Sequence, residues 1–436
     1  MRNKNLFIAL GDAKYGLHPY RVLNEINQTQ YLKTSEIEDI QLVYLKKLVS
    51  HICEHVPFYK EYAQNHDVTI NSLDDIVKLP VVDKKLINSR YNDFISDLCP
   101  KPYFIAKTTG SSGVPFSFIK TKEGEDYKIA SFIRAKNWFD VGRCDRVLKI
   151  SGIPPISFGV KEHIEEFIRF KATNRTEMFI TEMTDDNIPA LVEHINKTKP
   201  VAIVGLAGGV ALLAVKLKGN KDLKHNIKAI FVNSESITAL QRKQIFETFG
   251  VEPRSDYRAT EGSIAHECEC GGLHLDMEGC YAEIHNEDEN GVGDIVLTML
   301  HSFDMPLVRY RIGDKAKWRN EACKCGRGLK LIEDVIGRET DVIVLPNGKE
   351  YSSANLNYVP SNLKNVENLA EYQLFQTSKN EVLLKIVLVD KDNHAVVDEM
   401  RDEFGKIFEG CTLTIEVCDQ LVRGKGGKLR IVNPLK

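Results

Sequence analysis

The sequence predicts an α/β protein, with a large N-terminal domain of mixed and parallel sheets and helices and a small C-terminal α+β lobe. Its length of 436 residues exceeds that of one ordinary domain. Between residues 145 and 260, short apolar runs alternate with helical patterns, which is typical of a largely parallel sheet. After Gly337 the pattern changes to strands with one helix, and these roughly one hundred residues are enough for a separate lobe. We therefore expect the domains at residues 1–336 and 342–436.

The composition indicates a globular protein that does not bind nucleic acid. Hydrophobic residues make up 43% and charged residues 27%, and the net charge of −3 argues against a nucleic-acid or anionic-membrane binder. The longest apolar run, 201–215, contains glycines and is too short for a membrane span, so it predicts a buried strand running into a helix. The first residues lack the apolar segment of a signal peptide, and ten cysteines without one favour a reducing compartment. We expect a cytoplasmic protein.

The first third of the chain predicts helices and then a hairpin. Residues 35–65 show an amphipathic helical pattern that ends at 55–59, and 79–84 resemble a loop leading into another helix. Residues 104–106 and 115–119 are short strand candidates on either side of a run rich in glycine and hydroxyl groups.

The middle of the chain predicts four strand–helix repeats. The strands are expected at 147–150, 178–180, 201–204 and 229–232, and the helices at 162–170, 189–196, 210–217 and 239–249. Strands then follow at 281–284 and 293–298. The C-terminal lobe predicts strands at 342–345, 382–388, 412–417 and 429–432, with a helix at 395–408.

The run between the two hairpin strands has the residue types of a phosphate-binding loop. Glycine allows the backbone to approach a ligand closely, and the hydroxyl groups supply donors for phosphate oxygens. The run consists of Thr108, Thr109, Gly110, Ser111, Ser112 and Gly113, followed by Val114 and Pro115. It contains no lysine, so it is not a Walker A loop. A polar surface loop is an equally good interpretation of these residues alone.

Several spaced motifs together resemble the adenylate-forming enzymes, most closely the phenylacetate–CoA ligase-like and CapK-like branch. The resemblance extends over nearly the whole chain, and the order and spacing of the motifs carry it. They are the helix end Val56-Pro57-Phe58-Tyr59, the 108–115 loop, Ser234-Glu235-Ser236-Ile237, Tyr257-Arg258-Ala259-Thr260-Glu261, Arg309-Tyr310-Arg311-Ile312-Gly313-Asp314, and Arg423-Gly424-Lys425-Gly426-Gly427-Lys428-Leu429-Arg430.

The resemblance implies an ATP/AMP site. Ser234 and Glu235 would lie along the adenine, which Tyr257 would flank with its aromatic face. Thr260 would contact the phosphate and Glu261 would hold Mg²⁺.

The same resemblance implies that Asp314 accepts hydrogen bonds from the ribose hydroxyls and that Arg258 and Arg311 belong to the nucleotide site. Lys428 would be the adenylation lysine, with Lys425 as the alternative. Taken singly, these residues also fit a packed aromatic, a turn aspartate, a helix-start carboxylate and a solvated basic tail.

Residues 337–341 resemble the hinge about which the C-terminal lobe of the family rotates. The family commonly has two aspartates in this motif, and here Thr340 replaces the first. This departure leaves open which residue is the pivot, but it does not affect the predicted boundary between the two domains.

The cysteines predict a second site, for structural Zn²⁺. Cys268 and Cys270 form one C-x-C pair, Cys323 and Cys325 form another, and His274 follows the first. Thiolates and imidazole are the ligands that tetrahedral zinc prefers. Five candidates compete for about four places. The resemblance to zinc-containing members favours Cys268, His274, Cys323 and Cys325, with Cys270 as substitute, while unrelated free thiols are the alternative.

The predicted function is an AMP-forming ligase that activates a small, for example aryl, carboxylic acid and transfers the acyl group to coenzyme A. One alternative is transfer to an amine, as in surface-polysaccharide synthesis, and another is a non-catalytic nucleotide-binding or zinc-stabilised protein. Residues 205–209 and 151–155 are candidates for the acyl pocket. The oligomeric state stays open, with a homodimer as one alternative.

Overall fold

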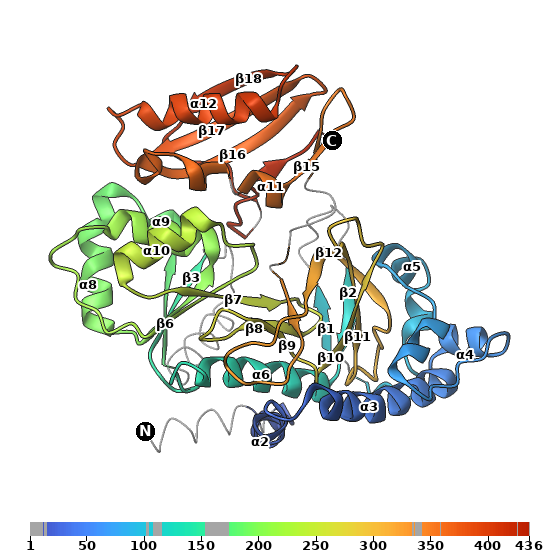
Figure 1. Ribbon diagram of the computed structural model, residues 1–436. Coiled ribbons are helices and arrows are strands. Elements are labelled where there is room, and N and C mark those ends of the chain that lie inside the picture. The colour runs from blue at the N-terminus through green and yellow to red at the C-terminus, as the bar shows by residue number, and fades with distance from the viewer. Residues whose placement is uncertain are drawn as a thin grey trace. The chain divides into compact units, whose positions relative to one another are not determined.

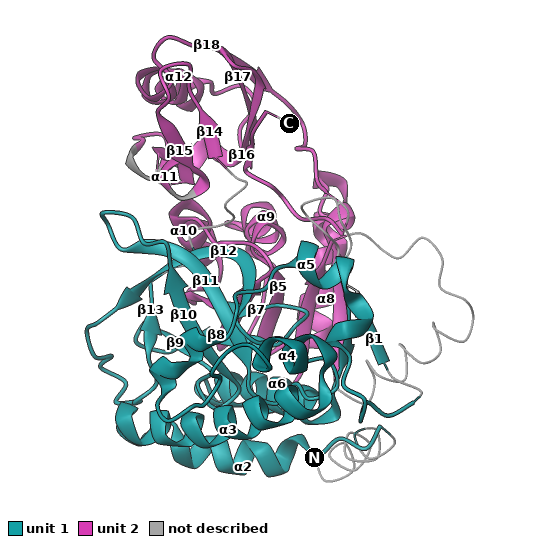
Figure 2. Cartoon of the chain, turned by 90° about the vertical axis from the view of Figure 1, so that its right-hand side faces the viewer, with its two compact units in different colours: residues 1–143, 256–335 teal, residues 144–255, 336–436 magenta. Residues whose placement is uncertain are grey.

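The computed structural model describes residues 12, 15–101, 104–107, 116–152, 174–333, 335, 342–357, 359–424 and 426–435. The chain forms two compact units (Figure 2). Unit 1 comprises Met1–Arg143 and Asp256–Val335, and unit 2 comprises Cys144–Ser255 and Ile336–Lys436. The predicted hinge at 337–341 and the helix expected at 162–170 lie outside the described ranges.

The helices of unit 1 begin at residues that suit helix starts (Figure 1). They are α2 (Pro19–Thr29), α3 (Thr34–His55), α4 (Pro57–Ala63), α5 (Lys84–Ser89) and α6 (Lys122–Asn137), with the 3₁₀ turns η1 (Leu73–Lys78) and η2 (Tyr91–Phe94). The single helix expected over 35–65 is divided, because Pro57 lacks the N–H that would continue α3 and instead opens α4. The side chain of Asp83 accepts the Leu86 N–H and caps α5, the helix expected after 79–84.

The strands of unit 1 are antiparallel. The predicted hairpin is formed by β1 (Phe104–Lys107) and β2 (Ser117–Lys120). The larger sheet has the order β10–β11–β12–β13–β9–β8–β7. Its strands are β7 (Pro253–Arg258), β8 (Ser263–Glu267), β9 (Leu273–Leu275), β10 (Cys280–His285), β11 (Val292–Met299), β12 (Tyr310–Arg319) and β13 (Leu331–Ile332). This arrangement brings β7 and β12, which carry two of the motifs, into one sheet.

The first part of unit 2 is the predicted parallel α/β segment. Its sheet has the order β6–β5–β3–β4, and each neighbouring pair is parallel. The elements are β3 (Val147–Ser151), β4 (Arg175–Phe179), η3 (Ile180–Glu182), η4 (Asp185–Asn187), α8 (Ile188–Thr198), β5 (Ala202–Leu206), α9 (Ala207–Leu217), β6 (Ala229–Asn233) and α10 (Ala239–Phe249). The apolar run 201–215 is therefore a strand leading into a helix, as expected. None of the helices that the structure describes is long and apolar enough to cross a bilayer.

The second part of unit 2 is an α+β layer, as predicted. Its sheet has the order β18–β17–β16–β19, and a small hairpin precedes it. The elements are β14 (Val342–Val344), β15 (Glu350–Ser352), α11 (Ser353–Asn357), η5 (Val359–Asn362), η6 (Val366–Asn368), β16 (Leu369–Ser378), β17 (Glu381–Leu388), α12 (Ala395–Ile407), β18 (Thr412–Val417) and β19 (Val432–Asn433). Alternate residues of β17 are buried, from Val382 to Leu388, and this face packs in one core with α12. The last strand begins at Val432, later than the 429–432 expected.

Candidate active site

Two motifs that are far apart in the sequence meet in unit 1. Tyr257 lies on β7 and Asp314 on β12, and the Tyr257 hydroxyl donates a hydrogen bond to Asp314 Oδ2 at 2.8 Å. Both side chains are only partly buried, so an aromatic face and a carboxylate lie together at an accessible place. This is the juxtaposition that adenine and ribose of one nucleotide would require.

The same two motifs make a second contact. The hydroxyl of Tyr310, which is 1% exposed, donates to Glu261 Oε1 at 3.3 Å. Burial, followed by the charge of Glu261, raises the pKa of Tyr310, so the phenol stays protonated and remains a donor. The hydrogen bond engages Oε1 of Glu261, and carboxylate oxygens are ligands that a hard cation prefers.

Lys128, which no sequence motif indicated, supports the backbone of the motif that runs from Tyr257 to Glu261. Lys128 on α6 donates from Nζ to the carbonyl oxygens of Ala259 and Thr260, both at 3.0 Å. Burial lowers the pKa of Lys128 to about 8, and the neighbouring charge of Lys120 acts in the same direction. A cavity adjoins these groups, and its polar lining includes Lys120, Thr121, Glu125, Lys128, Glu261 and Ser263. The helical periodicity of the sequence did not indicate a role for Lys128 in the site, because that role depends on contacts with residues more than a hundred positions away.

The remaining predicted residues of unit 1 have other partners. Arg258 pairs with Asp256 at 2.6 Å and its guanidinium lies 4.1 Å from the centre of the Phe132 ring. Arg311 Nε lies 3.9 Å from Asp294 Oδ2. The loop formed by Thr108, Thr109, Gly110, Ser111, Ser112 and Gly113 lies outside the described ranges, although the strands on both sides of it form the expected hairpin.

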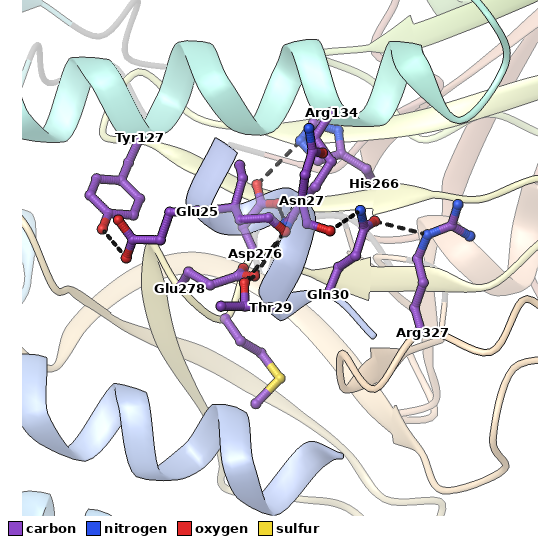
Figure 3. A network of polar contacts seen from close by, with 12 residues as sticks. Glu25, Asn27, Thr29, Gln30, Tyr127, Arg134, His266, Asp276, Glu278 and Arg327 are labelled. Atoms are coloured by element: carbon purple, nitrogen blue, oxygen red, sulfur yellow. Dashed lines mark hydrogen bonds and ion pairs between the residues drawn. The ribbon is translucent and has the colours of Figure 1, made fainter. Parts of the chain in front are cut away.

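A buried ionic network around Arg134, Asp276 and Glu278 (Figure 3) is linked through His266 to the strand that carries Tyr257. Arg134 on α6 is fully buried and donates to Asp276 at 2.9 Å and to Glu278 at 2.8 Å. His266 lies between two carboxylates, with ion pairs of 2.8 Å to Asp256 and 3.2 Å to Asp276. Burial opposes protonation of His266, but the charges of Asp276 and Asp256 outweigh it and raise its pKa to about 9. Asp256, the residue before Tyr257, is thereby linked to α6 through the charged contacts of His266, Asp276 and Arg134.

Ser234, Glu235 and Lys428 belong to unit 2. Ser234 is exposed and adopts a left-handed backbone conformation with φ of 67° just after β6. The carboxylate of Glu235 accepts backbone N–H groups from Gly208 at 2.9 Å and from Leu429 at 2.6 Å. Lys428 is half-buried and is one of the charges that act on Glu235. The alternative lysine, Lys425, lies outside the described residues.

The cysteine motif converges in unit 1 as a cluster of metal-ligand atoms. Single ligand atoms of Cys268, His274, Cys323 and Cys325 all lie within 4.8 Å of one another. Cys268 Sγ is 3.5 Å from Cys323 Sγ, and Cys325 Sγ is 3.2 Å from His274 Nε2. Cys270 is exposed and is not part of this cluster. The structure thus brings together the four residues that the resemblance favoured.

The surroundings of the cluster suit a tetrahedral thiolate–imidazole site. His274 Nδ1 donates to the Leu329 carbonyl at 3.2 Å, which turns Nε2 toward the thiols. Burial lowers the pKa of His274 to about 4, so the imidazole is neutral and available as a ligand. Any side chain at Gly272 would crowd this space, because a Cβ there would lie 2.8 Å from Cys323 Sγ. These observations fit a structural zinc ion.

Comparison with known proteins gives relatives over nearly the whole length. No family model matches the chain. Protein CapK of Staphylococcus aureus is 22% identical over 97% of this chain and 94% of its own. Phenylacetate-coenzyme A ligase of Thermus thermophilus is 24% identical over 94% of this chain and 99% of its own. These two proteins represent the branch that the motifs predicted, so the predicted resemblance is confirmed.

Solved structures with a similar fold are also ligases. A 2-hydroxyisobutyryl-CoA ligase in the postadenylation state, in complex with R3-HIB-AMP, matches with a TM-score of 0.72 and 17% identity, over 94% of this chain and 92% of that one. The anthranilate CoA ligase AuaEII in complex with anthranoyl-AMP matches with a TM-score of 0.52 and 14% identity, over 74% of this chain and 65% of that one. The likeness in fold therefore covers both the α/β part and the C-terminal layer in the first of these structures.

Proposed function

We propose that this chain, which has the fold of the adenylate-forming ligases, activates a carboxylic acid with ATP and passes the acyl group to coenzyme A. The observation that carries the proposal is the pairing of the two motifs in unit 1, Tyr257 with Asp314 and Glu261 with Tyr310. Tyr257, Glu261 and Asp314, which the resemblance assigned to one nucleotide site, are held by these two hydrogen bonds between the motifs. If each of these residues had only a structural role, there would be no reason for residues of both motifs to lie in contact.

In the first half-reaction, the substrate carboxylate attacks the α-phosphorus of ATP and pyrophosphate leaves. Tyr257 would flank the adenine, Asp314 would accept the ribose hydroxyls, and Thr260 would contact the phosphate. Mg²⁺ bound through Glu261 would neutralise phosphate charge. Lys428 would donate to the oxygens on which charge develops, and the 108–113 loop would hold the leaving phosphates.

In the second half-reaction, the thiol of coenzyme A attacks the acyl carbonyl and AMP leaves. We propose residues 337–341 as the hinge that withdraws Lys428, with 1–336 and 342–436 as the two moving parts. The alternative acceptor is an amine. The thiolate–imidazole cluster would hold zinc as a structural ion, since four protein ligands leave no open coordination position.

The deciding experiment is ATP–pyrophosphate exchange with a panel of aryl, fatty and amino acids, phenylacetate included. We expect at least one acid to promote exchange, and the adenylate formed from it to react with coenzyme A rather than with amino acids or amino sugars. Reaction with the amines alone would select the alternative acceptor. Nucleotide binding without exchange for any acid would favour a non-catalytic protein.

The variant Lys428→Ala tests the assignment of the adenylation lysine. We expect acid-dependent pyrophosphate release to fall by about 100-fold or more, because one preorganised donor to a developing charge contributes on that order. Lys406→Ala is the control, since Lys406 is 70% exposed on α12 and pairs with Glu403 of its own helix turn. Unchanged release in Lys428→Ala would contradict the assignment.

A further inference from the structure

The basic tail, of which the structure describes residues 423–424 and 426–430, is attached to the parallel part of unit 2 through one carboxylate. Leu429 N–H donates to Glu235 Oε1 at 2.6 Å, and Gly208 N–H donates to Glu235 Oε2 at 2.9 Å. Gly208 lies in the first turn of α9, and Glu235 follows β6 by two residues. Glu235 therefore joins the tail to the start of a helix, with one N–H group on each of its oxygens.

Charged neighbours support this attachment. Burial raises the pKa of Glu235, while the two N–H bonds and the positive charges of Arg423 and Lys428 favour its ionised form. Arg423 also donates to Glu371 on β16, and both of these side chains are largely buried. The tail is therefore held at two points, by the hydrogen bond of the Leu429 N–H to Glu235 and by the ion pair of Arg423 with Glu371.

Glycines allow the tail to approach closely. A Cβ at Gly152 would lie 1.7 Å from the carbonyl oxygen of Gly426, and a Cβ at Gly427 would lie 2.2 Å from Gly152 Cα. Gly427 also has a φ of 79°, which side chains rarely adopt. The tail thus meets the end of β3 backbone to backbone, and no other residue type fits at Gly152 without displacing it.

We propose that Glu235 is a positioning residue that docks the tail and so fixes Lys428 for the adenylation step. The backbone of Lys428 is held on both sides, because its carbonyl accepts the Gly424 N–H at 2.9 Å and the next N–H is the one bound by Glu235. This inference rests on the proposed function for its kinetic consequence. It differs from a contact between Glu235 and adenine, which would act on nucleotide affinity.

The docking is tested first without any substrate, by hydrogen exchange of the Leu429 amide in the full-length protein. We expect Glu235→Ala and Gly152→Ala each to raise the exchange rate at least tenfold, and Glu235→Gln to have a smaller effect, since its amide oxygen still accepts a hydrogen bond. Gly405→Ala is the matched control in the same layer, because a Cβ there meets nothing within 4 Å. An unchanged exchange rate in folded Glu235→Ala and Gly152→Ala would overturn the docking.

The kinetic test separates the two half-reactions, with phenylacetate or another acid from the panel as probe. We expect Glu235→Ala to slow pyrophosphate release at least tenfold at saturating ATP with the KM for ATP unchanged. Thioester formation from a supplied synthetic acyl-adenylate and coenzyme A should stay at the wild-type rate. A raised KM for ATP with normal turnover would overturn the positioning role in favour of nucleotide contact. Failure of the wild-type chain to activate any acid would instead contradict the proposed function. The hydrogen-exchange result would still test the docking independently.

Discussion

At the scale of single residues, the candidate site depends on hydrogen bonds that have a charged partner. The Tyr257 hydroxyl and Asp314 are the clearest pair, because the phenol holds the carboxylate in place while both remain accessible. The sequence motifs indicated each residue type, and only the structure, in which β7 and β12 belong to one sheet, shows that the two side chains touch. Lys128 illustrates the opposite case, since nothing in its local sequence distinguishes it from a surface lysine.

Replacing Tyr257 with Phe should weaken ATP binding and leave turnover nearly intact. The variant keeps the aromatic face but removes a hydrogen bond to a charged group, which contributes about 1.5–3 kcal/mol. We expect the KM for ATP in the exchange assay to rise by about tenfold, since 1.36 kcal/mol corresponds to that factor. Tyr31→Phe is the control, because Tyr31 is 58% exposed and its ring is retained. An unchanged KM would show that the contact does not serve nucleotide binding.

Lys128 should give stability a specific dependence on pH. Its pKa in the folded chain is lowered to about 8 from 10.5, so between these values the unfolded chain binds more protons than the folded one. Stability contributed by this site therefore rises with pH through that window, and the buried ammonium is unfavourable below it. We expect the stability of the wild type relative to Lys128→Met, measured by urea unfolding, to increase from pH 7 to pH 9.5. Lys46→Met, at an exposed position of α3, should show no such trend; a difference independent of pH at Lys128 would contradict the shift.

At the scale of elements, the sequence predicted those whose apolar pattern is local and missed those whose burial depends on distant charges. The helix expected at 239–249 is α10, because Thr238 caps the Gln241 N–H and Gly250 ends the helix in a left-handed conformation. In contrast, α6 buries Asp126, Arg134 and Lys136, which interrupt the apolar periodicity. The partners of Asp126 and Arg134 come from other parts of the chain, so the sequence alone gave no reason to place these two residues inside.

Breaking the buried pairs of Arg134 should destabilise unit 1 strongly. Arg134→Ala removes a buried positive partner from the carboxylates of both Asp276 and Glu278. Removing one partner of such a pair costs about 3–5 kcal/mol. Arg401→Ala on α12 is the matched control, since its pair with Asp398 is more than half exposed and should change stability by about 0.5 kcal/mol or less. Equal effects of the two substitutions in urea unfolding would show that the network does not anchor α6.

At the scale of the whole molecule, each unit is assembled from two separate stretches of chain. Unit 1 combines residues before Arg143 with residues after Asp256, and its cysteine cluster joins the β8–β9 turn to the segment before β13. The sequence predicted the ligand types and the lobe after residue 341, because both depend on local patterns. It placed both stretches of unit 1 within residues 1–336 but did not separate them from residues 144–255, because that grouping depends on pairing between distant strands.

Metal analysis should find about one zinc ion per chain, since four protein ligands make one closed site. Cys268→Ser and Cys323→Ser should lose the ion and lower the unfolding temperature, and a chelator should have the same effect on the wild type. Cys270→Ser should retain the ion, because Cys270 is exposed and lies outside the cluster. Zinc content that is equally low in all three variants, or absent from the wild type, would contradict a structural zinc site.

The division of unit 1 also bears on how the polypeptide is made. The main core of this unit packs Leu45, Leu48 and Ile52 of α3 with Leu307, Val308 and Tyr310, which are synthesised much later. During translation the apolar faces of the early helices therefore stay exposed until the strands that complete this core have left the ribosome. We expect nascent chains that stop before residue 256 to be bound by chaperones or degraded, because neither half of that core can bury its apolar side chains without the other.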